Sequence, residues 1–165
     1  MAKIKGLNKI DRIINEFTLQ FGIKADLDTE FQAFCDKMTI GYALFFNEED
    51  RIYFINDAEK RYPEIKADIF LWALMHEIGH CMTDDRWTEE EKAYFEEQKE
   101  TIAWMPADTE EDEQLRNDFY HNIPDEFFAT KWAGDYMREH PKKIAKFWNK
   151  LQAAIMRMYR KNGVI

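Results

Sequence analysis

One apolar segment, residues 63–82, constrains the fold more than any other part of the chain. Apolar side chains occupy nearly every helical face between positions 65 and 78. Pro63 suits the first turn of a helix, because the N–H that proline lacks has no helical partner there. A helix that is apolar on most faces must be surrounded by other elements. We therefore predict a central helix over residues 63–82.

The motif HEIGH lies near the end of this predicted helix and contains two of the four histidines of the chain. A helix places His76 and His80 on one face, where both imidazoles can bind one metal ion. Neutral imidazole suits Zn2+. Glu77 is rotated by about 100°, so it can flank the metal and act as general base on a water held there. The motif predicts a catalytic zinc site, with two hydrogen-bonded core histidines as the alternative.

The segment PDEFFATKWAGDYM, residues 124–137, supplies a candidate third ligand. In a helix, one face of this segment would consist of Glu126 and four small residues, namely Ala129, Thr130, Ala133 and Gly134. Small residues let two helices approach closely, and Glu126 is then the one long side chain at the contact. We predict that Glu126 completes a set of two histidines and one glutamate, which is one of the three-ligand sets of catalytic zinc sites.

Other residues near this segment compete for roles at the predicted site. Glu126 could instead only favour the helix dipole, which would leave His121 or Asp84 as the third ligand. A peptidase also needs a donor for the negatively charged oxygen of its tetrahedral intermediate. Tyr120 and His121, just before the helix, are the candidates, with packing and capping as their alternative role.

The motif HEIGH, followed by E-x-x-A-T-x-W-A at residues 126–133, resembles the ImmA/IrrE type of zinc metallopeptidase over roughly residues 40–137. That family pairs HExxH with a downstream E-x-x-A-(N/D)-x-F-A helix. Thr130 and Trp132 depart from the family pattern, and 45 residues separate His80 from Glu126. The resemblance implies a compact gluzincin, often encoded by phages and mobile elements, that acts on a repressor-type protein. Some members carry an N-terminal helix-turn-helix domain, which we do not find in this sequence.

The remaining pattern predicts an α+β fold for a single zincin-like domain, residues 1–165. Helical spacing of apolar residues predicts a helix over residues 7–20 that Gly22 ends. Asp28 can cap a second helix, which would bury Phe31, Phe34, Cys35 and Met38. Aromatic and branched residues at 42–46 and 51–55 predict a β-hairpin beside the HExxH helix. Two last helices are expected, one over residues 124–139 and one after Pro141.

Residues 84–118 form an acidic insertion between the two metal-binding motifs, with 14 Asp or Glu against 4 Lys or Arg. We predict a mostly solvated segment with one short helix near residues 88–103. The last helix is basic on one face, which we expect to be solvated or to face the acidic insertion. Contact of this face with nucleic acid is the alternative.

The composition indicates a globular cytoplasmic protein. A net charge of −9 argues against direct nucleic-acid binding by the whole surface. Two cysteines without a CxxC spacing suggest reduced thiols. The first 17 residues interleave charged with apolar side chains, unlike a signal peptide. No stretch approaches the roughly 20 apolar residues of a membrane span.

Taken together, these features predict a zinc metallopeptidase that hydrolyses a peptide bond in a protein or peptide substrate, such as a transcriptional repressor. A zincin-fold binding module that sequesters a regulator or toxin without cutting it is the main alternative. A DNA-associated protease of the SprT kind usually has a third histidine downstream and often a cysteine zinc module. The two unlinked cysteines and the net charge of −9 weigh against it. A structural metal held by four protein ligands is a further alternative.

Overall fold

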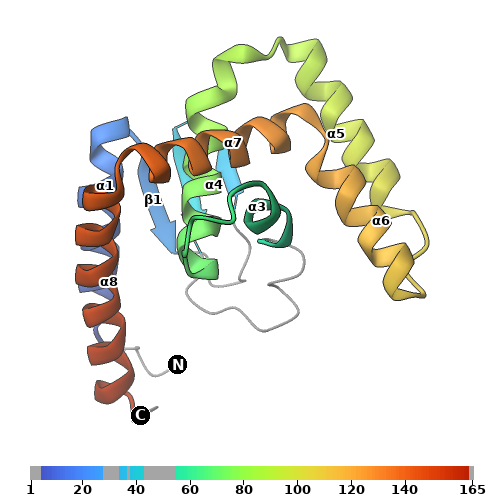
Figure 1. Cartoon of the computed structure of the whole chain (residues 1–165). Helices are drawn as coiled ribbons and strands as arrows, with labels where there is room; N and C mark the ends of the chain where they lie inside the picture. The colour runs from blue at the N-terminus through green and yellow to red at the C-terminus, as the bar shows by residue number, and fades with distance from the viewer. Residues whose placement is uncertain (1–4, 28–33, 37, 43–54, 164–165) are drawn as a thin grey trace.

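The structure, a computed structural model, describes residues 5–27, 34–36, 38–42 and 55–163, and it is rich in helices (Figure 1). The first helix, α1 (Leu7–Thr18), continues as a 3-10 turn, η1 (Leu19–Phe21). Gly22 ends it in the left-handed region at φ 70°, a conformation that glycine adopts without steric cost. The predicted helix over residues 7–20 is therefore confirmed.

A small three-stranded sheet follows, which agrees with the predicted α+β class. Its strands are β1 (Lys24–Leu27), β2 (Phe34–Asp36) and β3 (Thr39–Tyr42), and β3 lies in the middle. Strand β3 pairs in parallel with β1 and antiparallel with β2. Residues 34–36 were predicted as helix, which is wrong, because their backbone pairs with β3 instead. The rest of that predicted helix and most of the predicted hairpin, residues 28–33 and 43–54, lie outside the described residues.

The central helix is α4 (Ile69–Thr83), and 11 of its 15 residues are buried. It packs against β2 and β3, so a small sheet lies beside the HExxH helix, although its strands are not those of the predicted hairpin. The predicted start at Pro63 is wrong, because Pro63 lies between the short helix α3 (Asn56–Arg61) and α4. Asp68 sets the start instead, since its carboxylate accepts a hydrogen bond from the N–H of Phe70 at 2.8 Å.

The acidic insertion contains two helices that lie side by side, α5 (Glu89–Ala103) and α6 (Glu110–His121), and we call this pair the acidic arm (Figure 1). A short 3-10 turn, η2 (Asp84–Arg86), connects it to α4. Helix α5 was predicted, and a capping box formed by Thr88 and Glu91 begins it. Helix α6 was not predicted, because its acidic composition suggested a solvated loop. Its start is nevertheless encoded by Thr109, whose hydroxyl accepts from the N–H of Asp112.

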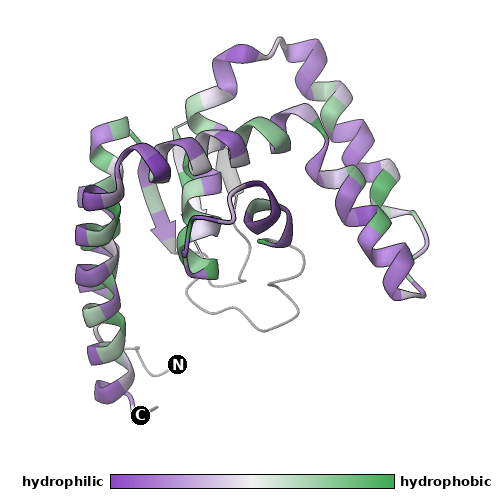
Figure 2. Ribbon diagram, in the orientation of Figure 1, coloured by the Kyte–Doolittle hydropathy of each residue, from purple (hydrophilic) through white to green (hydrophobic). Residues whose placement is uncertain are grey.

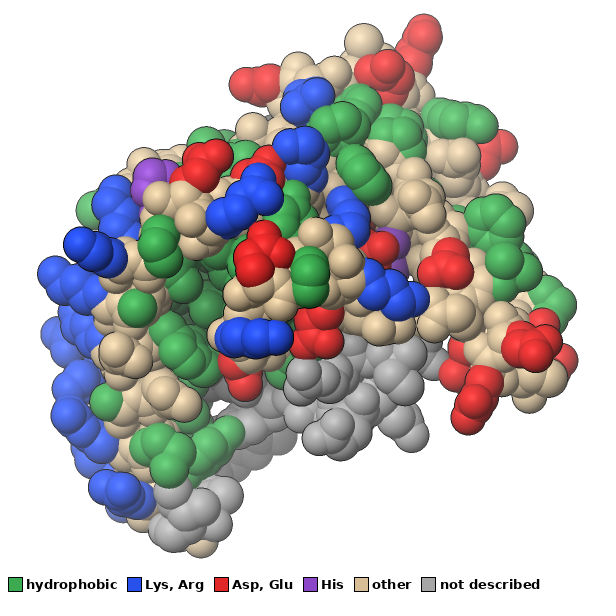
Figure 3. All heavy atoms as spheres, viewed as in Figure 1, with side chains coloured by type: hydrophobic (Ala, Val, Ile, Leu, Met, Phe, Trp, Pro, Cys, Tyr) green, Lys and Arg blue, Asp and Glu red, His purple; other side chains and the backbone are tan. Residues whose placement is uncertain are grey.

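Two predicted helices complete the chain, α7 (Pro124–Glu139) and α8 (Pro141–Lys161). Helix α8 packs on α1, with the rings of Phe17 and Phe147 stacked at 4.0 Å. Cations gather along α8, whereas acidic side chains project from the acidic arm on the opposite side of the molecule (Figure 3). The basic face of α8 is therefore solvated and does not face the arm. Within the described residues, no helix is long and apolar enough to cross a membrane.

Candidate metal centre

Helices α4 and α7 cross in close contact, and this contact builds the candidate site. The face of α7 predicted from its small residues is buried, namely Glu126, Ala129, Thr130, Ala133 and Gly134. On α4, Gly79 lies against the backbone of Ala129, so that a Cβ at position 79 would clash with the Ala129 carbonyl. This explains why glycine stands in the middle of a buried helix, where it is otherwise unfavourable.

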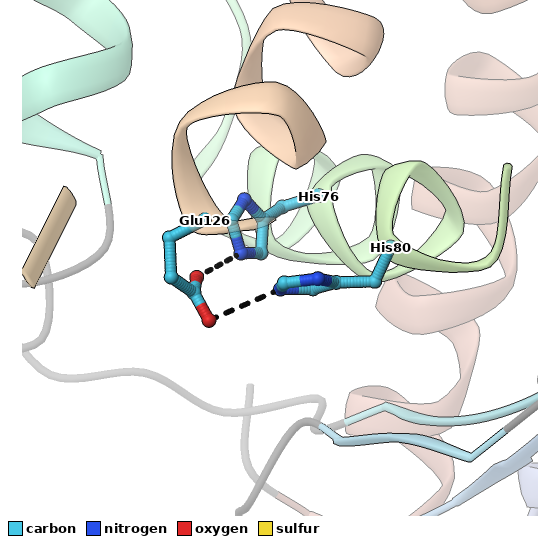
Figure 4. A group of neighbouring side chains, drawn as sticks. All are labelled: His76, His80 and Glu126. Carbon is cyan, nitrogen blue, oxygen red and sulfur yellow. Dashed lines mark hydrogen bonds and ion pairs between the residues drawn. The ribbon is translucent and has the colours of Figure 1, made fainter. Parts of the chain in front are cut away.

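The three predicted ligands come together at this crossing (Figure 4). One turn of α4 separates His76 from His80, and Glu126 projects toward both rings from the first turn of α7. Nε2 of His76 lies 2.8 Å from Oε2 of Glu126, and Nε2 of His80 lies 3.2 Å from Oε1. One ligand atom from each residue falls within 4.8 Å of the others. These three residues could therefore hold a metal ion.

A second layer of contacts orients the ligands. Nδ1 of His76 lies 2.9 Å from the hydroxyl of Thr130, so Nδ1–H can donate to Thr130 and leave Nε2 free for a metal. The hydroxyl of Tyr120 donates to Oε1 of Glu126 at 3.1 Å. The ammonium of Lys99, from α5, lies 3.0 Å from the same oxygen. Within the described part of the chain, the carboxylate of Glu126 therefore faces four potential donors, namely His76, His80, Tyr120 and Lys99.

Electrostatics favour an ionised Glu126 opposite the histidines. Burial alone would raise the pKa of Glu126, but the charge of His80 and the hydrogen bonds of both histidines hold it well below its usual range. Burial alone would likewise lower the pKa of His80, but Glu126 raises it to about 9. Without metal, the site is therefore held together by a carboxylate and a protonated imidazole.

Glu77 is buried beside the ligands and carries the charge environment expected of a base. Burial raises its pKa, while the nearby His76 and His80 act in the opposite direction. The charge of Glu126 also acts to raise the pKa of Glu77, and that of Lys99 acts to lower it. A raised pKa suits a carboxylate that accepts and returns a proton near neutral pH.

Of the other candidate residues, Tyr120 contacts a proposed ligand within the described part of the chain. Tyr120 reaches the centre through Glu126, whereas His121 is buried against the edge of the Tyr120 ring, with centroids 5.5 Å apart. Asp84 lies 3.0 Å from Lys92. In the described part of the chain, neither His121 nor Asp84 joins the group of potential ligands.

Two contributions at the site were missed from the sequence. Thr130 was counted only as a small residue, although its position one turn after Glu126 on the same face could have indicated a contact with the site. Lys99 gave no signal, because an isolated lysine in an acidic helix is ordinary on a solvated surface. Lys99 reaches Glu126 only because the arm packs on α7.

The donor set of two imidazole nitrogens and one carboxylate fits the coordination of catalytic zinc, which keeps a fourth position open. Comparison with known proteins adds no further identification. No protein-family model matches the chain, and searches of curated proteins and of solved structures find no match.

Proposed function

We propose that the protein is a zinc-dependent metallopeptidase with His76, His80 and Glu126 as the metal ligands. The observation that carries the proposal is the convergence of these three side chains at the α4–α7 crossing, with the buried Glu77 next to His76 in α4. Two hydrogen-bonded core histidines would also have partners such as Glu126 and Thr130. The buried carboxyl of Glu77, next to His76 in the chain, is the feature that they leave unexplained.

In this proposal each residue has a distinct role. A bound zinc ion would polarise the scissile carbonyl and lower the pKa of a water molecule. Glu77 would take the proton of the attacking water and deliver it to the leaving amine. Tyr120 places a hydroxyl at the site, where it can donate to the negatively charged oxygen of the tetrahedral intermediate. With zinc bound, Thr130 would accept a hydrogen bond from Nδ1–H of His76 and so favour the tautomer whose Nε2 is available to the metal.

The sequence resemblance to the ImmA/IrrE type supports a regulatory protein of the repressor type as the substrate. The experiment has two parts. Elemental analysis should find about one zinc per chain in the wild type and much less in Glu126→Ala. Digestion of a proteome-derived peptide mixture, read by mass spectrometry, should give cleavages that Glu77→Gln loses while keeping its zinc. Equal cleavage by zinc-loaded Glu77→Gln would disprove the proposed base.

A second candidate function is a zincin-fold binding module that holds a partner without cutting it. One observation favours it. The ribbon of the acidic arm is mostly hydrophilic (Figure 2), yet the arm and its loop expose large apolar side chains. These residues are Tyr94, Trp104, Leu115 and Phe119. Exposed aromatic residues among charges are typical of protein interfaces.

The two functions separate when the arm surface is changed without touching the metal site. Deleting the arm is unsuitable, because it would also remove Lys99 from Glu126. Leu115→Ser together with Trp104→Ser leaves every contact of the centre in place. If this variant keeps zinc and peptide cleavage, the exposed apolar surface of the arm is not required for catalysis. If the wild type holds zinc but cleaves nothing in the peptide mixture, the binding module becomes the better interpretation.

A further inference from the structure

Lys99 is a half-buried cation that joins the acidic arm to the third metal ligand. Its side chain is 18% exposed, and its ammonium lies 2.8 Å from Oδ2 of Asp125 and 3.0 Å from Oε1 of Glu126. Asp125 in turn accepts a hydrogen bond from the N–H of Glu126 at 2.8 Å. The ammonium therefore faces two carboxylates on the first turn of α7, and one of them is the proposed ligand.

Two effects of Lys99 on a metal ion oppose one another. Its charge repels a cation, whereas its contact with Oε1 fixes the orientation of the carboxylate. The repulsion is small here, because Asp125 neutralises the ammonium at 2.8 Å. The orienting contact remains, because oxygen Oε1 is held while Oε2 faces His76. The main effect of Lys99 is therefore to position the Glu126 carboxylate, and its repulsion of a metal ion is secondary.

We infer that Lys99 is a positioning residue of the metal centre, which holds Oε1 of Glu126, the oxygen that faces His80, so that the carboxylate meets the two histidines. The inference rests on the proposed metal site and adds to it a role for the acidic arm. Residues that orient a metal ligand typically affect metal affinity by about 10–100-fold. The arm is therefore part of the metal centre and not only an insertion between two motifs.

The test is zinc affinity, measured by competition with a chromophoric chelator. Lys99→Met should weaken zinc binding by about tenfold or more, and Lys99→Arg should restore most of the affinity because it keeps both charge and donors. Lys92→Met is the matched control: Lys92 lies on the same helix and pairs with Asp84 and Glu89 at 3.0 and 3.2 Å, away from the ligands. The Lys92→Met variant should bind zinc with the affinity of the wild type.

The visible absorption of the Co2+-loaded protein gives a readout that a merely structural lysine would not change. A displaced Glu126 should alter the intensity and position of the Co2+ bands in Lys99→Met and not in Lys92→Met. Circular dichroism and thermal unfolding of the metal-free variants check that the fold is intact. Zinc affinity and a Co2+ spectrum equal to wild type in folded Lys99→Met would overturn the inference, as would tighter binding. Failure of the wild type itself to bind metal would instead contradict the proposed function.

Discussion

The crossing of α4 and α7 and the acidic arm differ in how they are held and in what they add to the site. The crossing is nearly closed to solvent, with 11 of 15 residues of α4 buried and small residues between the helices. In the arm, α5 buries only Phe95 and α6 only His121. Yet both helices of the arm reach Glu126, through Lys99 and Tyr120.

The difference shows how one site can combine a rigid and a loosely held part. The ligands His76, His80 and Glu126 all come from the closely packed crossing, where a shift of one helix would disturb many contacts. The groups that orient Glu126 from outside come from a region with few buried apolar contacts, which is the kind of region that opens most easily. Four predictions test this contrast.

The largest effect is expected for Phe95→Ala. Phe95 is 4% exposed and packs edge-on against Trp87, with ring centroids 5.1 Å apart. Removing a buried phenyl ring costs about 3–5 kcal/mol, and here the cost should fall on the arm. Hydrogen exchange should become faster in α5 and α6 while α4 and α7 remain protected. Tyr94→Ala is the control, because the neighbouring ring is 57% exposed. Equal acceleration in all four helices would show that arm and crossing unfold as one unit.

The second prediction concerns pH and belongs to the crossing. In the metal-free protein the pKa of His80 is raised to about 9 from its ordinary 6.5, although burial and Lys99 act to lower it, because Glu126 and Glu77 raise it. The resulting stability is fully present below pH 6.5 and is lost as the pH rises through 9. The pKa of Glu126 is lowered, so Glu126 adds stability that is fully present above pH 4.5, its ordinary pKa. This stability is lost as the pH falls through the lowered pKa.

Urea unfolding of the metal-free protein should therefore give a free energy about 3 kcal/mol lower at pH 10 than at pH 6. Glu126→Gln should flatten this dependence, because it removes the partner of His80. Zinc affinity should change in the opposite direction and rise over the same range, since zinc requires neutral imidazole. A wild type equally stable at both pH values would contradict the ion pair between the two helices.

The closely packed crossing and the acidic arm also differ in how far they could be predicted from the sequence. The existence of the helices α1, α4, α5, α7 and α8 and the small face of α7 follow from the local sequence pattern, which needs no knowledge of the fold. Strand β2 does not, because its backbone pairs with β3 only once the chain has turned back. Helix α6 was missed because charge was taken to exclude helix, although Thr109 and the acidic first turn favour one.

The candidate site divides in the same way. The four central residues were predicted because HEIGH encodes a spacing on one helix, and because Glu126 stands out against small neighbours. The contact of Lys99 with Glu126 depends on how α5 packs against α7, which no spacing within either segment reveals.

The third prediction, Gly79→Ala, probes the closeness of the crossing. In an ordinary helix this change gains about 1 kcal/mol. Here the added Cβ would clash with the carbonyl of Ala129, so α4 and α7 must move apart, at a cost of about 1–3 kcal/mol. Thr101→Ala in α5 is the matched change on the arm, where the side chain is exposed, and should change stability by less than about 0.5 kcal/mol. A Gly79→Ala protein more stable than wild type in urea unfolding would refute the close contact.

The smallest effect is expected at Trp104, which lies just after α5 and is 90% exposed. An exposed side chain contributes little to folding, so Trp104→Ser should change the free energy of unfolding by less than about 0.5 kcal/mol. Zinc affinity should also be unchanged, because Trp104 contacts none of the ligands. A substantial loss of stability would mean that the arm is packed as firmly as the crossing. Unchanged stability and affinity would leave Trp104 free for contact with a protein partner, where an exposed indole is worth most.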